Sequence, residues 1–299
     1  HHTTNRFHAK TTLDLIEKHK ISSLCAPPTV LRMFIKEDLG RYKFSLRECV
    51  AAGEPLNPEV IEAWRRGTGM TIRDGYGQTE STCMIGNLPG SKIKYGSMGK
   101  PMFMYDAVIA DEEGVILDDF EEGSICVRME QGEQINGIFK GYLFDKEREA
   151  RGFQHGLYYT GDKAYRDEDG YIWFVGRDDD VIKASDYRIG PFEVESVLLE
   201  HPAVTESAVV GSPHHLKGYE VKAFIILGTD VEPTKKLADE LFTYSRQHLA
   251  PYKMPRIIEF VEELPKTISG KIRRVELRAK EAEDKAKKIT KDTEFFYKR

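Results

Sequence analysis

The chain has 299 residues, which is too many for one ordinary hydrophobic core and enough for two domains. Hydrophobic residues make up 40% and charged residues 31%, an ordinary composition for a globular protein. The formal net charge of −5, with basic and acidic residues mixed along the chain, argues against a general nucleic-acid binder. No apolar run in the sequence approaches the roughly 20 residues that a membrane-spanning helix needs.

The cysteines and the first residues bear on where the protein resides. Four cysteines lie among apolar or small neighbours, none of them at metal-ligand spacing (Cys25, Cys49, Cys83 and Cys126). This pattern predicts reduced, part-buried thiols in a cytoplasmic protein. The start, His1-His2-Thr3-Thr4, lacks an initiator Met and the apolar core of a signal peptide. We therefore expect the chain to begin inside a longer protein or to carry the remnant of a fusion.

The first third of the chain predicts helices between short strands. Apolar residues recur at helical spacing over 11–19 and 28–39, and Cys25-Ala26-Pro27-Pro28 separates the two segments. Asn57-Pro58-Glu59 predicts a helix start, because it offers a side-chain acceptor at the cap, a proline in the first turn and an acid near the positive helix end. We therefore expect residues 1–92 to form an α/β region.

Residues 93–178 have a different sequence pattern, which is typical of β-structure. Short strand-like runs at 107–110, 124–128 and 171–175 alternate with Gly and Asp turns. Asp167-Glu168-Asp169-Gly170 predicts a hairpin turn. Such spacing predicts a small, mostly antiparallel barrel or sheet that packs on the α/β region.

A further change comes where four polar residues, 177–180, follow an apolar strand. The segments beyond it predict a helix over 190–201, strands over 207–211, 221–227 and 256–261, and a helix over 234–248. The tail after residue 276 alternates Lys and Glu, which favours a solvated helix over a binding element. The predicted fold class is therefore α/β followed by a smaller α+β domain.

Four motifs occur in a fixed order along the chain. They are Asp74-Gly75-Tyr76-Gly77-Gln78-Thr79-Glu80, then Tyr159-Thr160-Gly161-Asp162, then residues 176–183 (Gly-Arg-Asp-Asp-Asp-Val-Ile-Lys), then residues 265–271 (Pro-Lys-Thr-Ile-Ser-Gly-Lys). Together they resemble the signature of acyl-CoA synthetases and other acyl-adenylate-forming enzymes. The resemblance implies activation of a small-molecule carboxylic acid by ATP to acyl-AMP, followed by transfer to coenzyme A. It implies ATP/AMP, Mg²⁺ and coenzyme A as cofactors.

The first motif suits the adenylation chemistry. In a Gly-spaced loop Thr79 can supply a hydroxyl for a phosphate, Glu80 a carboxylate for Mg²⁺, and Tyr76 a flat face for adenine. The alternative is a turn that ends a strand, with Thr79 capping the next helix.

Other nucleotide contacts follow from the resemblance. Gly53, Glu54 and Pro55 come after a strand-like run and align with the segment that family members place against adenine. A carboxylate such as Asp162 can accept hydrogen bonds from two ribose hydroxyls, and the Arg177 guanidinium can clamp phosphate oxygens. A plain loop, a turn and a surface salt bridge are the respective alternatives. The resemblance adds Asp74, Gln78, Phe174 and Arg188 as nucleotide contacts.

The resemblance divides the chain after residue 178. Residues 1–178 align with the end of the large AMP-binding domain and 179–299 with the small mobile C-terminal domain, with Asp179 as the hinge. Relatives move the segment from Lys183 to Glu195 into the active site when the CoA thiol attacks. CoA contacts are thereby assigned to Asp186, Tyr187 and Arg246.

Asp186 departs from the family pattern, since most members have Gly before the aromatic residue. An Asp would narrow the pantetheine tunnel and add negative charge there. The alternative is that Asp186 tolerates the same backbone shape and turns outward, and we favour this alternative.

Lys271 closes the set of motifs. Its compact ammonium can bridge the attacking carboxylate and the α-phosphate, offsetting negative charge that builds in the transition state. The resemblance gives Lys271 and Lys183 catalytic roles. The alternative is a solvated basic loop, because Lys266, Arg273 and Arg274 lie nearby.

Gly77 bears on the choice of acid. Acetate-specific relatives carry a bulky Trp at this place, and Gly77 would leave a deeper acyl slot. One methylene is worth about 1–3 kcal/mol of discrimination, so the loss of a whole indole changes the chain-length class. The resemblance therefore favours a medium-chain, branched or aromatic acid.

One expected motif is absent from the 299 residues. Relatives carry a Ser/Thr/Gly-rich phosphate loop ending in Pro-Lys before all four motifs, and the sequence contains no such loop. We therefore expect this chain to be a C-terminal portion that lacks the N-terminal part of the same protein and is inactive alone. Two alternatives stay open, namely an acyl-AMP ligase that loads a carrier protein and a nucleotide-binding module without catalysis.

Overall fold

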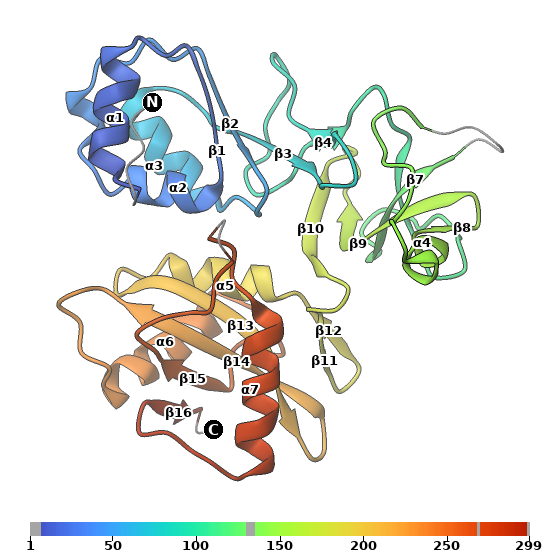
Figure 1. Cartoon of the computed structure of the whole chain (residues 1–299). Helices are drawn as coiled ribbons and strands as arrows, with labels where there is room; N and C mark the ends of the chain where they lie inside the picture. The colour runs from blue at the N-terminus through green and yellow to red at the C-terminus, as the bar shows by residue number, and fades with distance from the viewer. Residues whose placement is uncertain (1–6, 130–134, 268–269, 298–299) are drawn as a thin grey trace. The chain divides into compact units, whose positions relative to one another are not determined.

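The computed structural model describes residues 7–129, 135–267 and 270–297, and it divides into two compact units, 1–174 and 175–299 (Figure 1). The boundary between the two units lies four residues before the domain boundary that the resemblance predicts after residue 178. The predicted domain boundary stays a prediction. Ile268 and Ser269 of the last motif lie outside the described residues.

The first unit begins with a five-stranded sheet and three helices. The sheet has the order β1-β2-β3-β4-β5, in which β1, β2 and β3 are parallel and β4 and β5 are added antiparallel. The strands are β1 (Ser23–Ala26), β2 (Glu48–Ala52), β3 (Arg73–Gly77), β4 (Cys83–Gly86) and β5 (Lys100–Pro101). The helices are α1 (Ala9–Lys18), α2 (Pro28–Phe34) and α3 (Pro58–Thr68), with a 3₁₀ turn at Leu39–Arg41.

The helix predictions hold with two corrections. Helix α2 ends at Phe34 and not at residue 39, because the chain turns there so that Leu39 is buried under Gly67 of α3. Asn57 does precede α3, but its side chain makes no cap hydrogen bond. Its Oδ1 accepts a hydrogen bond from Arg32 Nη1 at 3.4 Å instead, which ties α3 to α2.

The rest of the first unit is rich in β-structure, as predicted. Strands β6 (Ala107–Ala110), β7 (Gly123–Arg128) and β9 (Leu157–Arg166) pair antiparallel in this order. Strands β8 (Phe153–Gln154) and β10 (Ile172–Arg177) both pair with β9, and helix α4 (Lys146–Gly152) precedes β8. The predicted turn at 167–170 joins β9 and β10. The Asp167 carboxylate accepts hydrogen bonds from the amides of Asp169 and Tyr171, and Gly170 supplies the positive φ of 82°.

The second unit is a six-stranded sheet with three helices. The order β12-β11-β14-β15-β16, with β13 paired to β14, mixes parallel and antiparallel neighbours. The strands are β11 (Ile182–Ala184), β12 (Tyr187–Ile189), β13 (Val204–His214), β14 (Gly218–Leu227), β15 (Ile257–Phe260) and β16 (Glu294–Phe296). The helices are α5 (Pro191–Leu199), α6 (Lys235–His248) and α7 (Arg274–Ala286). The predicted fold class, α/β followed by a smaller α+β part, is confirmed.

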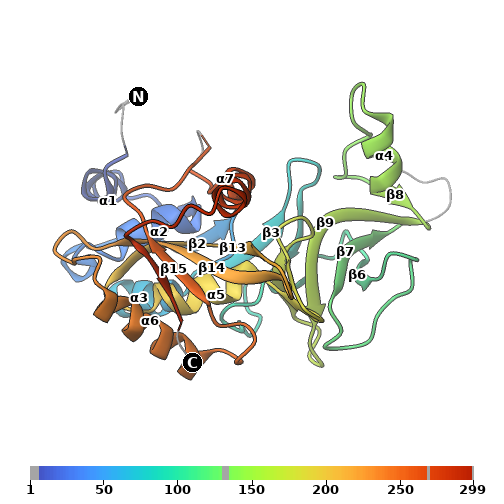
Figure 2. The ribbon, with the colours of Figure 1, turned by 90° about the horizontal axis from the view of Figure 1, so that it is seen from below.

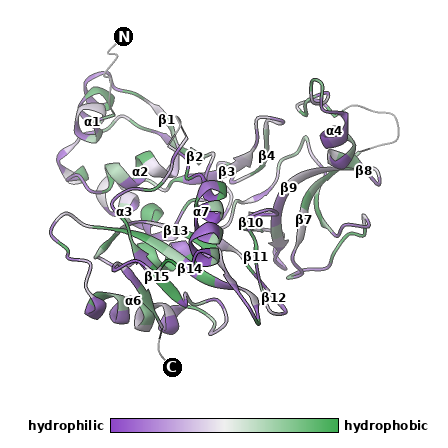
Figure 3. Ribbon diagram, turned by 60° about the horizontal axis from the view of Figure 1, so that its bottom comes forward, coloured by the Kyte–Doolittle hydropathy of each residue, from purple (hydrophilic) through white to green (hydrophobic). Residues whose placement is uncertain are grey.

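The two faces of this sheet carry different helices. Figure 2 shows α5 and α6 on one face and α7 on the other. Side chains alternate along the strands accordingly: Val209 faces the cluster with α5 and α6, whereas Ala208 and Val210 face the cluster with Leu277 of α7. Figure 3 shows hydrophobic residues along β13 and β14, between the two helical layers.

Two sequence expectations need correction. The tail helix is not simply solvated, because Leu277 and Glu281 of α7 are buried against the sheet. Cys49 and Cys126 are buried, and burial raises the pKa of each thiol to about 12, but Cys25 and Cys83 are exposed. Within the described residues, no helix is both long and apolar enough to cross a membrane.

Candidate active site

Three predicted nucleotide contacts converge in the first unit. The Tyr76 hydroxyl donates to Asp162 Oδ2 at 2.6 Å, and Gln78 Nε2 donates to the same oxygen at 2.6 Å. Gln78 Nε2 also donates to the Thr160 carbonyl at 3.0 Å. Tyr76 ends β3 and Asp162 lies in β9, 86 residues later. The first two motifs therefore form one site.

The protonation of Tyr76 follows from its surroundings. Burial, and then the negative charge of Asp162, raise the pKa of Tyr76 well above 10, so the phenol stays a proton donor. The Tyr158 hydroxyl donates to Gln78 Oε1 at 3.3 Å, which orients the amide so that Nε2 faces Asp162. We did not predict Tyr158, although it directly precedes the second motif.

Glu80 is held by two residues that we did not predict. The Tyr142 hydroxyl donates to Glu80 Oε1 at 2.9 Å, and Arg148 Nη2 lies 3.6 Å from the same oxygen. The Arg148 guanidinium also sits over the Tyr142 ring, 4.0 Å from its centroid. Tyr142 precedes α4 and Arg148 lies in its first turn, so neither has a sequence signal linking it to a motif 62 residues earlier.

Thr79 and Glu80 do not precede a helix, so our alternative of a Thr helix cap is wrong. Thr79 is exposed, and the chain after Glu80 continues through Ser81 into strand β4. The amide of Phe139 donates to the Glu80 carbonyl at 2.8 Å, and the amide of Thr82 donates to the Gly137 carbonyl at 2.9 Å. The predicted metal and phosphate contacts therefore lie on a backbone braced by residues 137–139.

The carboxylate of Glu80 fits a Mg²⁺ ligand. Mg²⁺ in nucleotide enzymes is bound by one or two carboxylates together with substrate phosphates and water. Glu80 offers one half-buried carboxylate beside the exposed hydroxyl-bearing Thr79. The nearby Arg148 cation shows that this position already attracts positive charge.

Asp74 is a buried residue of strand β3. Its side chain accepts a hydrogen bond from the Gly75 amide at 2.9 Å, and its carbonyl accepts one from Asn87 Nδ2 at 3.0 Å. Burial raises the pKa of Asp74 to about 8, so the carboxyl group is mostly protonated at pH 7. The carboxyl of Asp74 is thus turned into the protein, and its predicted nucleotide contact stays a prediction.

Gly77 is required by the backbone around it. A Cβ at this position would lie 2.5 Å from the Thr82 carbonyl oxygen and 3.2 Å from Cys83 Cα. The pairing of β3 with β4 is irregular at this point, between Tyr76 and Gly77. Gly77 therefore has a structural reason to be glycine besides the acyl slot that we predict.

The predicted adenine segment and Phe174 have structural partners. Gly53 adopts a positive φ of 93°, which favours glycine, just after β2. The Glu54 carboxylate accepts a hydrogen bond from Thr29 Oγ1 at 2.7 Å and lies 3.6 Å from Arg32 Nη2. Phe174 packs against the core shared by the two sheets of this unit. The Glu54 side chain is thus engaged by α2, and its backbone, with that of Pro55, is the part suited to a flat base.

The second unit presents its predicted residues on the surface. Lys183 and Arg188 are exposed and face each other across the β11–β12 pair. Tyr187 is half exposed, and its ring stacks on Tyr252 with centroids 4.2 Å apart. Arg246 is exposed near the end of α6. Arg177 and Asp179 are also exposed, with Arg177 Nε 3.2 Å from Asp179 Oδ1.

Asp186 is exposed in the turn between β11 and β12. The positive φ of this turn, 54°, falls on Ser185, and Asp186 is not among the residues with positive φ. The backbone therefore has no need of glycine at position 186. That Asp186 turns outward, away from a tunnel, stays a prediction.

Lys271 is exposed at the end of a loop closed on Thr267. The Lys271 amide donates to Thr267 Oγ1 at 3.1 Å, and the Thr267 amide donates to the Lys271 carbonyl at 2.8 Å. Gly270 has a φ of 90° with open space around it. The loop thus fixes the Lys271 backbone and leaves its side chain in solvent.

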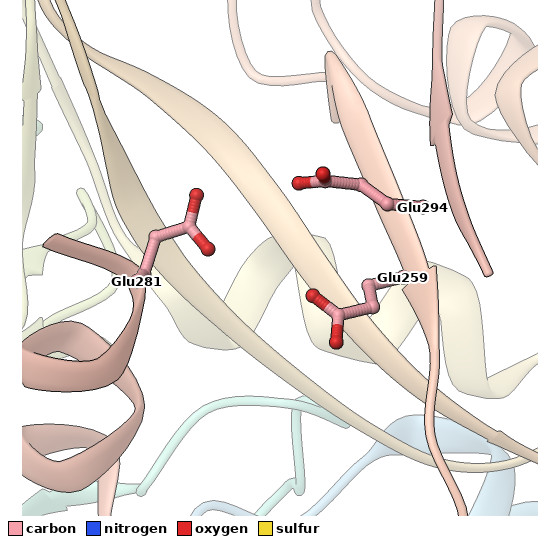
Figure 4. Close-up of side chains that lie close together, drawn as sticks. All are labelled: Glu259, Glu281 and Glu294. Atoms are coloured by element: carbon pink, nitrogen blue, oxygen red, sulfur yellow. The ribbon is translucent and has the colours of Figure 1, made fainter. Parts of the chain in front are cut away.

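A second group of carboxylates in this unit has the geometry of a metal site but holds a lysine. Figure 4 shows Glu259 of β15, Glu281 of α7 and Glu294 of β16 directed toward a common space, with their ligand atoms within 4.8 Å of one another. The Lys222 ammonium lies 2.7, 2.5 and 2.7 Å from these three carboxylates. The cation position is therefore taken by Lys222, and we assign no metal to this group, called here the Lys222 cluster.

Burial lowers the pKa of Lys222, but the three carboxylates outweigh it and raise the pKa above 10.5. Burial raises the pKa of Glu294, and the Lys222 hydrogen bond outweighs it, so that pKa falls below 4.5. Lys285 lies 3.3 Å from Glu294 Oε1, the oxygen that Lys222 also contacts, and Lys291 lies 2.7 Å from the other oxygen of Glu259. At neutral pH Lys222 is therefore charged and Glu294 is ionised, and two further lysines lie beside the cluster.

Comparison with known proteins agrees with this geometry. Residues 1–143 match the AMP-binding enzyme family, and residues 193–271 match the AMP-binding enzyme C-terminal domain. The chain belongs to the AMP-binding enzyme family. This confirms the resemblance drawn from the four motifs.

Among curated relatives, the chain is 54% identical over 284 residues to 4-hydroxybutyrate–CoA ligase 1 of Metallosphaera sedula, covering 94% of this chain and 50% of that protein. It is 48% identical over 283 residues to the mitochondrial acyl-coenzyme A synthetase ACSM3 of Mus musculus, covering 94% and 49%. The chain therefore spans about half the length of the curated relatives that it matches.

Solved structures give the same result. The anthranilate CoA ligase AuaEII in complex with anthranoyl-AMP matches with a TM-score of 0.85 and 37% identity, over 93% of this chain and 53% of that one. A benzoate CoA ligase from Burkholderia xenovorans matches with a TM-score of 0.79 and 32% identity, over 91% and 54%. The fold is that of adenylate-forming CoA ligases.

Proposed function

We propose that this chain supplies nucleotide-, metal- and CoA-contacting segments of an AMP-forming acyl-CoA synthetase. In the first step a carboxylate oxygen of the acid attacks the α-phosphorus of ATP, the bond to the β-phosphate oxygen breaks, and pyrophosphate leaves. In the second step the CoA sulfur attacks the acyl carbon, the bond to the AMP oxygen breaks, and AMP leaves as the thiol proton is released. The observation that carries this proposal is the convergence of Tyr76 and Gln78 on Asp162.

In the first unit, Asp162 would accept the ribose hydroxyls, with Tyr76 and Gln78 fixing its orientation. Tyr76 and the backbone of Gly53 to Pro55 would contact adenine, and the Thr79 hydroxyl would contact a phosphate. Glu80, oriented by Tyr142, would be the carboxylate that holds Mg²⁺. When bound, the metal ion supplies positive charge against the phosphates, which lowers the cost of the negative charge that builds as pyrophosphate leaves.

In the second unit, Lys271 is the proposed catalytic cation of the adenylation step. Its exposed position on a loop of fixed backbone suits a side chain that reaches toward a substrate held elsewhere. Lys183 keeps the catalytic role that the resemblance implies, Arg177 and Arg188 would contact the nucleotide, and Asp186, Tyr187 and Arg246 would contact CoA. Asp179 would act as the hinge when the second half-reaction begins.

The proposed acid is larger than acetate: medium-chain, branched or aromatic. Gly77 supports this size class, since no side chain projects there. The names of the relatives agree in kind, because they include CoA ligases for 4-hydroxybutyrate, anthranilate and benzoate. The first test is pyrophosphate exchange by the intact protein with a panel of such acids, and exchange with acetate alone would contradict the size class.

CoA is the proposed acceptor, and a carrier protein is the alternative. The exposed Asp186, whose backbone has no need of glycine, supports CoA. Thioester formation on free CoA by the intact protein distinguishes the two acceptors. Thioester formation only on a carrier protein would overturn the choice of CoA.

The role of Lys271 has a matched test. Lys271→Ala is expected to slow adenylation about 10²–10³-fold, the usual loss when one transition-state contact is removed. The conversion of pre-made acyl-adenylate to acyl-CoA should persist. Lys266→Ala, five residues earlier in the same loop, removes a lysine that pairs with Glu206 and should change neither step. Equal loss of both steps in Lys271→Ala would refute the assigned role.

We also propose that these 299 residues alone form little acyl-CoA, because they contain no Ser/Thr/Gly-rich phosphate loop ending in Pro-Lys. Acyl-CoA formation by the isolated chain at the rate of the intact protein would overturn this. The cytoplasmic location stays a prediction, and the name of the mouse relative includes the word mitochondrial.

A further inference from the structure

The segment just after the unit boundary forms a turn. The amides of Asp180 and Val181 donate to the Arg177 carbonyl at 3.0 and 3.1 Å. The boundary falls between Phe174 and Val175, so this turn is among the first residues of the second unit. It contains Asp179, the proposed hinge.

Charged side chains of α7 hold the far end of this turn. Arg278 forms an ion pair with Asp180, and Arg274 Nη1 lies 3.8 Å from Asp180 Oδ2. Arg274 also forms a bidentate pair with Glu195 of α5, with distances of 2.7 and 2.9 Å to its two oxygens. The Val209 amide of β13 donates to Glu195 Oε1 at 2.7 Å. We call Asp180, Arg274, Arg278 and Glu195 the linker clasp.

The two acids of the turn differ in how they are held. The Asp180 side chain is only 10% exposed, and through the linker clasp it is tied to α5, α7 and β13. The Asp179 side chain is 62% exposed and shared, with Arg177 Nε at 3.2 Å and Arg278 Nη2 at 3.6 Å. Exposed ion pairs contribute little to stability, so Asp179 can exchange partners readily, whereas Asp180 sits in a coupled, part-buried network.

We propose that Arg278 is a positioning residue for the hinge. With Arg274 it anchors Asp180 to the second unit, so rotation is confined to Asp179 and the residues before it. Asp179 exchanges between Arg177 and Arg278 during that rotation, which controls whether Arg177 is available for a nucleotide phosphate. The inference deepens the proposed function and rests on it for the hinge, while the clasp itself is tested without any substrate.

Hydrogen exchange at the turn is the deciding measurement, on the 299-residue chain. In Arg278→Met the amides of Asp180 and Val181 should exchange about tenfold faster, the order expected when a coupled ion-pair network loses one partner. Arg278→Lys keeps the charge but loses the guanidinium fork whose two nitrogens reach Asp180 and Asp179, so its exchange rate should fall between that variant and the wild type. Lys280→Met removes one positive charge from an exposed position of the same helix and should change nothing at the turn.

Unchanged exchange at Asp180 and Val181 in a folded Arg278→Met chain would overturn the clasp. Should Arg278→Met fail to fold, Asp180→Asn removes the same ion pair at constant shape and is expected to give the same faster exchange. Unchanged exchange in that variant would equally overturn the clasp.

The second measurement concerns the reaction of the intact protein. Arg278→Met should lower kcat several-fold for both adenylation and thioester formation and leave the KM for the acid unchanged, because no acid contact is lost. If Arg278→Met exchanges faster at the turn but keeps the wild-type kcat for both steps, Arg278 is not a positioning residue for the reaction. An intact wild-type protein that activates no carboxylic acid would refute the proposed function and leave the exchange result standing.

Discussion

The Lys222 cluster and the Asp162 site both hold buried carboxylates, three in the first and one in the second, and they stabilise them in different ways. In the Lys222 cluster, lysine ammonium groups lie against three buried glutamates at ion-pair distance. At Asp162, the hydrogen bonds come from the phenol of Tyr76 and the amide of Gln78, which fix the carboxylate without adding a positive charge. Ion pairing in the Lys222 cluster suits buried carboxylates with a purely structural role. Neutral hydrogen bonds at Asp162 suit a carboxylate that also binds a ligand.

The two regions should also respond to pH differently. The stabilising contributions of Glu294 and Lys222 are present above pH 4.5 and below pH 10.5, because their folded pKa values are shifted outward from those limits. Near the Asp162 site, Asp74 has a folded pKa of about 8, raised from 3.8. The contributions of Glu294 and Lys222 should therefore stay constant between pH 5 and pH 8, where the contribution of Asp74 changes.

Breaking the charge balance of the Lys222 cluster should have the largest effect. Lys222→Met leaves three buried glutamates without their central cation, and we expect the free energy of unfolding to fall by about 3–5 kcal/mol. The free energy of unfolding is measured in urea, with hydrogen exchange of the amides of the second unit as the signal. Lys235→Met, which removes an exposed pair with Asp239, should cost about 0.3–0.5 kcal/mol. A similarly small cost for Lys222→Met would mean that the cluster carries little stability.

Titration of Asp74 should produce the next largest effect. Between about pH 4 and pH 8 the unfolded chain has lost this proton while the folded chain keeps it, so stability should fall as the pH rises through that window. Asp74→Asn should remove this part of the slope. Urea midpoints measured from pH 5 to pH 8 for both proteins test it, and parallel curves would contradict the buried, protonated carboxyl.

Neutralising Asp162 sharpens the contrast between the two regions. Asp162→Asn should weaken AMP binding by the intact protein by about 1.5–3 kcal/mol, the range for hydrogen bonds to a charged group, with little loss of stability. Titration calorimetry measures the affinity. Asp119→Asn, which removes an exposed pair with Arg166 in the same unit, is the control and should leave AMP affinity unchanged. Equal affinities for all three proteins would remove Asp162 from the nucleotide site.

The smallest effect is expected from a methyl group at Gly77. Gly77→Ala should cost about 1–3 kcal/mol, because its Cβ would overlap the Thr82 carbonyl and the backbone would have to shift. Gly40→Ala, where the nearest atom is 3.6 Å away, should change stability by less than about 0.5 kcal/mol. Thermal unfolding of both variants is the check. If Gly77→Ala does not change the unfolding temperature, the loop after β3 accommodates the added methyl group without loss of stability.

The sequence was sufficient for the fold class, most helices and the order of the motifs. Capping residues and apolar periodicity are local signals, and so they predicted the start of α3 and both ends of α5 and α6 within a few residues. Recognition of the motifs also named Tyr76, Gln78 and Asp162 as one group. The hydrogen bonds that join them span 84 to 86 residues, and no local spacing encodes that contact.

The Lys222 cluster was missed because each of its members looks ordinary in its own segment. Glu281 and Lys285 belong to a charged tail that reads as solvated. A signal did exist, since Lys222 interrupts the apolar run 221–227 and Glu259 interrupts the apolar strand β15. Tyr142 and Arg148 were missed for another reason: their contact with Glu80 depends on where α4 packs, which is a tertiary property.

The opposed pair Lys183 and Arg188 has a consequence for how this protein can be handled. Like charges directly opposite on paired strands repel, so the β11–β12 hairpin is least stable in dilute, anion-free solution. An anion placed between the two cations would act as a structural part, and by mass action it would stabilise whatever fold presents them. Polyphosphate or nucleotide in the buffer should therefore serve as a folding aid, detectable as a rise in Tm well before any turnover is assayed.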